Sequence, residues 1–271
     1  MIIRTRTQAR IPPSAARFCL HGAAWAVACL LVFASHALAD TAASATAPQS
    51  GTRPIYVLPL GDSITQGGRN DRPEYTYRYP LYYMLKDAGY PVDFIGSLHA
   101  GLNADAVWPD KNGVPFDLDH EGHYGWTTSE VRDNLKGWMT TYPAAPDIVL
   151  IHLGSNDEHA WSYRRAIIRP LEDIIAMLRE KNPHVVILIG HMIANGRNAR
   201  ASRPLLDELA QRISTADSPV VTVPHFIDWH ERPGEPGSDT FDWAHPNPQG
   251  QQKMADKWFA AMKPFLDGLR K

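Results

Sequence analysis

The chain has 271 residues, of which 44% are hydrophobic, and its formal net charge is −2 at neutral pH. This length and composition are typical of a globular protein with a large core. No run of basic residues stands out, which disfavours nucleic-acid binding because that needs clustered Lys and Arg to neutralise phosphates.

Residues 1–39 predict a secretory signal peptide. Four arginines precede an apolar run at 23–33, no acidic residue occurs before Asp40, and small residues before it suit cleavage after Ala39. The apolar run is shorter than the roughly 20 residues that a membrane span needs. We therefore expect cleavage, a secreted or periplasmic protein, and no stable membrane insertion.

The mature chain would contain no cysteine, because Cys19 and Cys29 both lie in the signal peptide. This excludes disulfides, thiol catalysis and Cys-based zinc sites. Of the 27 basic residues four would be removed and all 29 acidic residues kept, so the mature net charge would be −6. Residues 40–53 are rich in Ala, Ser, Thr, Pro and Gly and predict a flexible tether, followed by one domain over 54–271.

Within this domain, apolar runs alternate with helical patterns. Asn247 can cap a final helix that starts at Pro248, and Pro264 should bend or end it. Continuous apolar strands alternating with helices predict a three-layer α/β/α fold, with a doubly wound, five-stranded parallel sheet covered on both faces. The predicted strands are 55–60, 92–95, 148–153, 185–190 and 220–223, and the predicted earlier helices are 77–88, 129–139, 167–178 and 205–213.

Ligands of such sheets bind beyond the carboxyl ends of the strands, where two motifs lie. Ser63 follows the first strand in Gly61-Asp62-Ser63, as a nucleophile or only as a helix cap. Asn156 follows the third strand in Gly154-Ser155-Asn156-Asp157, where its amide can donate to an oxyanion or belong to a simple turn.

Two further motifs suit the same chemistry. Asp242 stands three residues before His245, so its carboxylate can accept from one ring nitrogen while the other faces a serine. The alternative is an ordinary contact in a solvated loop. Gly125, in Gly122-His123-Tyr124-Gly125-Trp126, can offer its N–H to an oxyanion or be a plain loop glycine.

Together these motifs resemble the four blocks of the SGNH, or GDSL-like, hydrolase superfamily, from about residue 55 to the last helix. The resemblance implies a flavodoxin-like fold and esterase activity without a cofactor, with Ser63 as nucleophile and Asp242 and His245 as its partners. It also implies an oxyanion hole formed by Ser63, Gly125 and Asn156. No G-x-S-x-G motif surrounds Ser63, which argues against the α/β-hydrolase fold.

Within the superfamily, several stretches resemble acetylxylan esterases of carbohydrate esterase family three. They are 76–78 with Leu81, 92–97, 121–126 and 147–157. This resemblance implies an acetylated polysaccharide as substrate, and we expect Asp62, Trp126 and Trp243 to contact it.

A metal site is an alternative use of the acidic and histidine residues between 117 and 123. Their spacing is not His-Glu-x-x-His and Gly122 would break a helix, so we expect no metal there. The residues concerned are Asp117, Asp119, His120, Glu121 and His123.

Three functions remain open. The first is a secreted esterase that removes short acyl groups, acetyl above all, from a polysaccharide. The second is a lysophospholipase or thioesterase acting on longer acyl chains, although no long aliphatic run is available to line an acyl groove. The third is a carbohydrate-binding protein without turnover, which would have no use for a complete Ser-Asp-His set.

Overall fold

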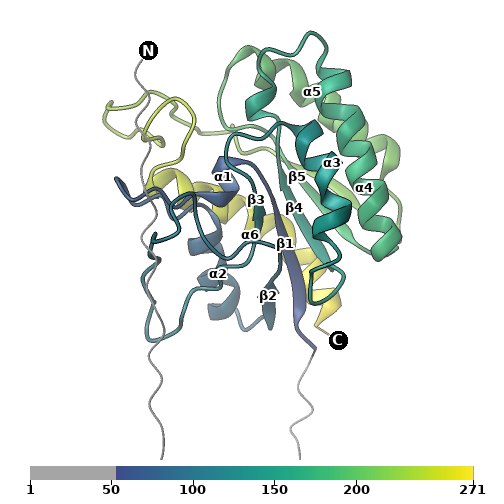
Figure 1. Cartoon of the computed structure of the whole chain (residues 1–271), viewed down its shortest axis with the longest axis horizontal. Helices are drawn as coiled ribbons and strands as arrows, with labels where there is room; N and C mark the ends of the chain where they lie inside the picture. The colour runs from purple at the N-terminus through teal and green to yellow at the C-terminus, as the bar shows by residue number, and fades with distance from the viewer. Residues whose placement is uncertain (1–52, 271) are drawn as a thin grey trace, which may run out of the picture. The chain divides into compact units, whose positions relative to one another are not determined.

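The computed structural model describes residues 53–270 of the chain (Figure 1). The predicted signal peptide and residues 40–52 of the predicted tether lie outside the described residues. Within residues 53–270, no helix is both long and apolar enough to cross a bilayer.

Six strands form one sheet in this part of the chain, and all their pairings are parallel. Five lie in the order β2-β1-β4-β5-β6, while the short β3 pairs with the carboxyl end of β1. The strands are β1 (Ile55–Gly61), β2 (Val92–Phe94), β3 (Glu121–Gly122), β4 (Ile148–His152), β5 (Val186–Gly190) and β6 (Val220–Val223).

The strand order changes direction between β1 and β4. The chain first adds β2 on one side of β1 and then places β4 on its other side. A crevice opens beyond the carboxyl ends of the strands at such a point, and it is where doubly wound sheets bind their ligands. Gly61 pairs with His152, so the two strands end side by side and the residues after them share this crevice.

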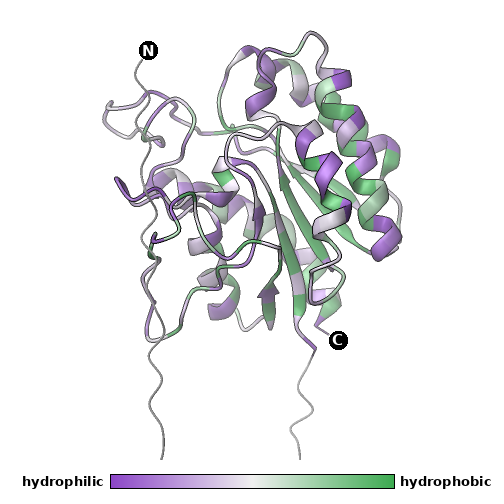
Figure 2. Cartoon of the chain, viewed as in Figure 1, coloured by the Kyte–Doolittle hydropathy of each residue, from purple (hydrophilic) through white to green (hydrophobic). Residues whose placement is uncertain are grey.

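Two hydrophobic cores lie on the two faces of the sheet. Side chains alternate along a strand: Val57 and Ile148 belong to one core, and Leu58 and Val149 to the other. Helices α2 (Arg78–Asp87) and α6 (Pro248–Leu269) supply the first core. Helices α3 (Thr128–Trp138), α4 (Arg169–Lys181) and α5 (Arg197–Ile213) supply the second. Figure 2 shows hydrophobic strands between helices whose outer surfaces are hydrophilic.

These observations confirm the predicted three-layer α/β/α fold. Each of the five predicted strands is present, with ends that differ by no more than one residue. The sheet also contains β3, which was not predicted because two residues carry no readable alternation of polar and apolar side chains.

Two of the predicted helices differ from the structure by more than three residues at one end. Helix α5 begins at Arg197, eight residues before the predicted start, because its first two turns are mostly polar and precede Pro204. Helix α6 does not end at Pro264 but continues to Leu269, and Leu266 beyond the proline is fully buried in the core. The packing of this last turn outweighs the backbone hydrogen bond that a proline cannot donate.

Candidate active site

Ser63 opens α1 (Ser63–Gln66), a single helical turn directly after β1. The buried Asp62 caps this turn, since its Oδ1 accepts the N–H of Ile64 at 2.9 Å. A Cβ on Gly61 would overlap the Thr65 hydroxyl and come within 2.7 Å of the carbonyl oxygen of His152. The tight turn that presents Ser63 therefore requires glycine at position 61.

Arg78 holds the other end of this turn. Its guanidinium is buried and donates to the carbonyl oxygens of Thr65 at 2.7 Å and Gln66 at 3.1 Å, and to that of Leu118 at 3.0 Å. The carbonyls of Thr65 and Gln66 have no helical partners because they stand at the end of α1. One member of the 76–78 motif thus fixes the turn that carries Ser63.

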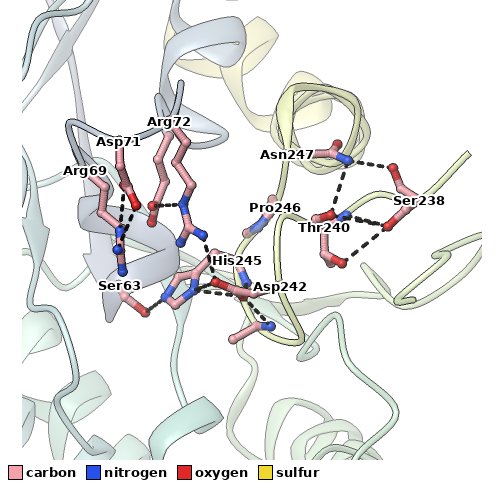
Figure 3. A network of polar contacts seen from close by, with 12 residues as sticks. Ser63, Arg69, Asp71, Arg72, Ser238, Thr240, Asp242, His245, Pro246 and Asn247 are labelled. Atoms are coloured by element: carbon pink, nitrogen blue, oxygen red, sulfur yellow. Dashed lines mark hydrogen bonds and ion pairs between the residues drawn. The ribbon is translucent and has the colours of Figure 1, made fainter. Parts of the chain in front are cut away.

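The loop that carries Asp242 and His245 is closed on itself and attached to α6. The N–H of Phe241 donates to the carbonyl of His245 at 2.9 Å. Asn247 caps α6 by accepting from the N–H of Gly250 at 3.1 Å, and its amide donates to the carbonyl of Ser238 at 2.6 Å (Figure 3). The predicted cap residue of the last helix therefore also positions the histidine loop.

The structure brings Ser63, His245 and Asp242 into one hydrogen-bonded line (Figure 3). His245 Nε2 lies 3.0 Å from Ser63 Oγ, and His245 Nδ1 lies 2.9 Å from Asp242 Oδ2. In such a line the imidazole can accept the hydroxyl proton while the carboxylate orients the ring and stabilises its charged form.

Several donors surround the Asp242 carboxylate. Its Oδ1 accepts the N–H of His245 at 2.7 Å and that of Ala244 at 2.8 Å. Partial burial alone would raise the pKa of this carboxyl, but those two backbone bonds and the imidazole hold the pKa well below its usual range. Asp242 is therefore ionised at neutral pH.

Sequence reasoning missed Arg72, which contacts the same oxygen of this carboxylate as His245 Nδ1. Arg72 Nη1 lies 2.9 Å from Asp242 Oδ2, and its Nε donates to the buried Glu74 at 2.9 Å. Its guanidinium also lies over the ring of Phe241, 5.0 Å from the centroid. Arg72 comes from the loop between α1 and α2, so no local sequence pattern links it to position 242.

Ser63, the first of the three predicted oxyanion donors, opens α1, and the other two, Gly125 and Asn156, lie on two loops that contact each other. Gly125 has a φ of +82° and is exposed, and a Cβ there would meet nothing within 4 Å. Asn156 donates one amide N–H to the carbonyl of Trp126 at 2.8 Å. An amide carries two N–H donors, and this bond uses one of them. Asp157 joins the same loops by accepting the Thr128 hydroxyl at 2.8 Å.

The residues predicted to contact substrate lie in very different surroundings. Asp62 is fully buried beneath α1. Trp126 packs against the second core, with its ring 4.7 Å from His123 and 5.4 Å from Trp138. The Trp243 side chain is 70% exposed beside the triad residues, so only Trp243 presents a free ring to a ligand.

The acidic and histidine residues between 117 and 123 are engaged in structural contacts. Glu121 is buried and accepts from Ser97 Oγ at 2.8 Å, Tyr142 at 2.6 Å and His123 at 2.7 Å. His120 contacts backbone atoms through both ring nitrogens. Asp117 accepts the N–H of Phe94 and that of Asp119. In residues 53–270, no three His, Cys, Asp or Glu side chains are grouped to hold a metal.

Two hollows adjoin the triad and share no lining residue. The first, of about 350 Å³, reaches the triad through Ile64 and Ala244, the neighbours of Ser63 and His245. Apolar side chains gather in it from separate segments, although no single aliphatic run was visible in the sequence. Its walls include Met192, Ile193 and Trp243, with Glu158, Asn195 and Glu231 among its polar residues.

The second hollow, of about 500 Å³, reaches the triad through Arg72.

Comparison with known proteins agrees with this geometry. The chain is 26% identical over 241 residues to a multidomain esterase of Ruminococcus flavefaciens, covering 82% of this chain but only 30% of that protein. A carbohydrate esterase family 3 structure from Talaromyces cellulolyticus is 27% identical with a TM-score of 0.65, over 79% of this chain and 99% of that one. An acetyl esterase mutant solved with an acetate ion is 26% identical, also with a TM-score of 0.65 and the same coverage.

The family itself follows from a longer match. Residues 60–253 match the GDSL-like lipase/acylhydrolase family, and this range includes Ser63, Asn156 and His245. The chain therefore belongs to the GDSL-like lipase/acylhydrolase family and is a carboxylic ester hydrolase of the SGNH type.

Proposed function

We propose that this chain is a secreted serine esterase that removes acetyl groups from a polysaccharide such as xylan. The observation that carries the proposal is the hydrogen-bonded line from Ser63 through His245 to Asp242. It stands in a chain that matches a carbohydrate esterase family 3 structure over 99% of that structure's length. The similarity to an acetyl esterase supports the short acyl group.

The proposed reaction proceeds through an acyl-enzyme on Ser63. His245 Nε2 takes the hydroxyl proton as Ser63 Oγ attacks the ester carbonyl, and the resulting oxyanion accepts from the N–H groups of Ser63 and Gly125 and from the amide of Asn156. One such donor typically stabilises the transition state by about 3 kcal/mol. His245 then gives the proton to the leaving sugar hydroxyl, and water, activated in the same way, releases acetate.

The hollow beside Trp243 suits the sugar side of this ester. The exposed ring of Trp243 offers a flat apolar face, and Asn195 and Glu231 supply hydrogen-bonding groups in the wall of the same hollow. Sites that bury a ligand commonly combine apolar surface with a few polar groups in this way. Trp126, whose ring already packs against those of His123 and Trp138, is not needed for this contact.

A second function is favoured by the same hollow. A volume of about 350 Å³ with Ile64, Met192 and Ile193 in its walls would also accept an acyl chain longer than acetyl. The chain would then be a lysophospholipase or a thioesterase, and the hollow would hold the acyl group instead of the sugar.

A series of p-nitrophenyl esters from acetate to palmitate separates the two functions. If the chain is a polysaccharide deacetylase, kcat/KM falls steeply from acetate to butyrate and nearly vanishes at octanoate, because overfilling a small acyl pocket costs roughly 1–3 kcal/mol. Acetylated xylan should also release acetate. A flat or rising series without acetate release would favour the second function. If the protein hydrolyses no ester at all, the remaining function is that of a carbohydrate-binding protein without turnover.

The secreted location is a separate part of the proposal. It is supported by the basic start, the apolar run and the small residues before Asp40. Mass spectrometry of the protein recovered outside the cytoplasm should give a mature chain that begins at Asp40. Recovery of the full-length chain from the cytoplasm would contradict this location and leave the esterase proposal untouched.

A further inference from the structure

We propose that the 500 Å³ hollow formed by residues 68–75 and 105–108 is a second carbohydrate subsite, which binds an uncharged, hydroxyl-rich unit of the same polysaccharide. The proposal rests on the proposed function, since it extends the glycan beyond the unit that carries the acetyl group. We call this hollow the polar hollow.

The backbone of the polar hollow is held in one conformation by close contacts. Gly68 has a φ of +75°, and a Cβ there would overlap the backbone of Gly101 and lie 2.8 Å from the ring of Trp108. Its N–H donates to the carbonyl of Glu74 at 2.8 Å, closing the loop. Thr76, at the end of the loop, has a φ of +63°, which is costly for a β-branched residue. Such strain is concentrated at ligand-binding sites.

The polar side chains of the hollow are also held in advance of any ligand. Asn70 Nδ2 donates to Asp105 Oδ1 at 2.6 Å, which joins the two segments that form the walls. Arg69 donates to both carboxylate oxygens of Asp71 at 3.0 Å. Planar side chains fixed in this way can still offer free donors and acceptors to hydroxyl groups, and less conformational entropy is lost on binding.

The charges of the hollow indicate a neutral ligand. Its two guanidinium groups face three carboxylates, and each guanidinium is already paired with at least one of them. The excess of carboxylates disfavours a uronic acid or a phosphate. The lining also lacks the run of aliphatic side chains that an acyl chain would need. A polyol that exchanges hydrogen bonds with Asn, Asp and Arg side chains is the chemistry that fits.

Its position places the hollow within reach of the same substrate. Arg72 lines the hollow and contacts Asp242 Oδ2 at 2.9 Å, whereas the hollow of Trp243 lies against Ile64 and Ala244. A polymer with its ester at Ser63 can therefore occupy both hollows at once, but a small ester cannot reach the polar hollow.

The test compares a polymer with a small ester. For Asn70→Ala and Asp105→Ala, the ratio of kcat/KM on acetylated xylan to kcat/KM on p-nitrophenyl acetate should fall at least fivefold, mainly through KM on the polymer. Arg132→Gln is the control, because Arg132 pairs with Asp133 on the exposed face of α3, away from both hollows. A ratio that stays within twofold in both variants would overturn the subsite.

Binding separates failure of the subsite from failure of the proposed function. Calorimetric titration of xylohexaose into the Ser63→Ala protein should give binding that Asn70→Ala weakens at least fivefold. If the wild type releases no acetate from any glycan but this binding is found, the subsite stands and the deacetylase function fails. Absence of xylohexaose binding, or tighter binding of oligogalacturonate than of xylohexaose, would overturn the neutral subsite.

Discussion

Arg72 offers the sharpest test of the electrostatics of the triad. Two successive contacts of 2.9 Å, from Arg72 to Asp242 and from Asp242 to His245, place the guanidinium within about 6 Å of His245 Nδ1. A positive charge at that distance disfavours the imidazolium by about 0.7 kcal/mol in water and about 3 kcal/mol at an effective dielectric constant of about 20. Because the Asp242 side chain is 39% exposed, we expect a value near the lower end, about 1 kcal/mol.

Replacing Arg72 with Gln removes this charge. The acid side of the pH profile of kcat/KM should then move to higher pH, because no positive charge opposes protonation of the imidazole from that side. The plateau kcat should fall up to about tenfold, because Asp242 loses one of the groups that hold it in place. The measurement is kcat/KM on p-nitrophenyl acetate from pH 5 to pH 9.

Glu74 complicates this variant and provides its control. The Glu74 side chain is buried against Arg72, so Arg72→Gln also leaves a carboxylate unpaired and should cost about 1–3 kcal/mol of unfolding free energy. The double variant Arg72→Gln/Glu74→Gln should regain stability, and its acid side should lie between those of wild type and Arg72→Gln, because the paired negative charge is removed as well. Arg72→Lys, which keeps the charge, should restore the position of the acid side. An unshifted acid side in Arg72→Gln, with kcat within twofold of wild type, would refute the reasoning.

Four further predictions follow from the site. Ser63→Ala should lower kcat by about 10⁴–10⁶ without altering the unfolding midpoint, and a loss of less than tenfold would rule Ser63 out as nucleophile. EDTA should leave the rate unchanged, whereas a loss restored by zinc or calcium would reveal a metal. Trp243→Ala should reduce activity on acetylated xylan more than on p-nitrophenyl acetate, while Trp126→Ala should affect both alike, and equal ratios in the two variants would contradict sugar stacking on Trp243. Burial lowers the pKa of His152 to about 4, so the unfolded chain takes up the proton first as the pH falls below about 6.5, and His152 alone should account for up to about 3 kcal/mol of stability lost by pH 4. Burial also lowers the pKa values of His120 and His225, so in urea denaturation His152→Gln should lose less stability than wild type between pH 7 and pH 4, and an equal loss in the two proteins would contradict the role of His152.

The sheet could be predicted because its strands are buried on both faces. Residues 148–152 and 186–190 are apolar at nearly every position and fully covered, so the sequence signal is strong. The first turns of α5 carry no such signal, since they are mostly polar, and tertiary contacts alone decide that they are helical.

Some residues of the candidate site could likewise be predicted from the sequence, and others could not. Ser63, Asp242 and His245, which hydrogen bonds join in the structure, could be proposed from the sequence because each stands in a short motif beside a strand or a helix end. Arg72 could not, because its contact with Asp242 depends on how the loop after α1 folds across to a loop 170 positions later. Trp126 and Trp243 look equivalent in the sequence, and only burial distinguishes the packed ring from the free one.

Ser63 and His245 meet across 182 positions of the chain. The chain between them includes β2 to β6, and such long-range contacts form slowly because the closure entropy of the intervening chain must first be overcome. Hydrolysis therefore reports on completed folding and not on local structure. During refolding, esterase activity should return only with the last and slowest phase, after most of the helical circular dichroism signal has recovered.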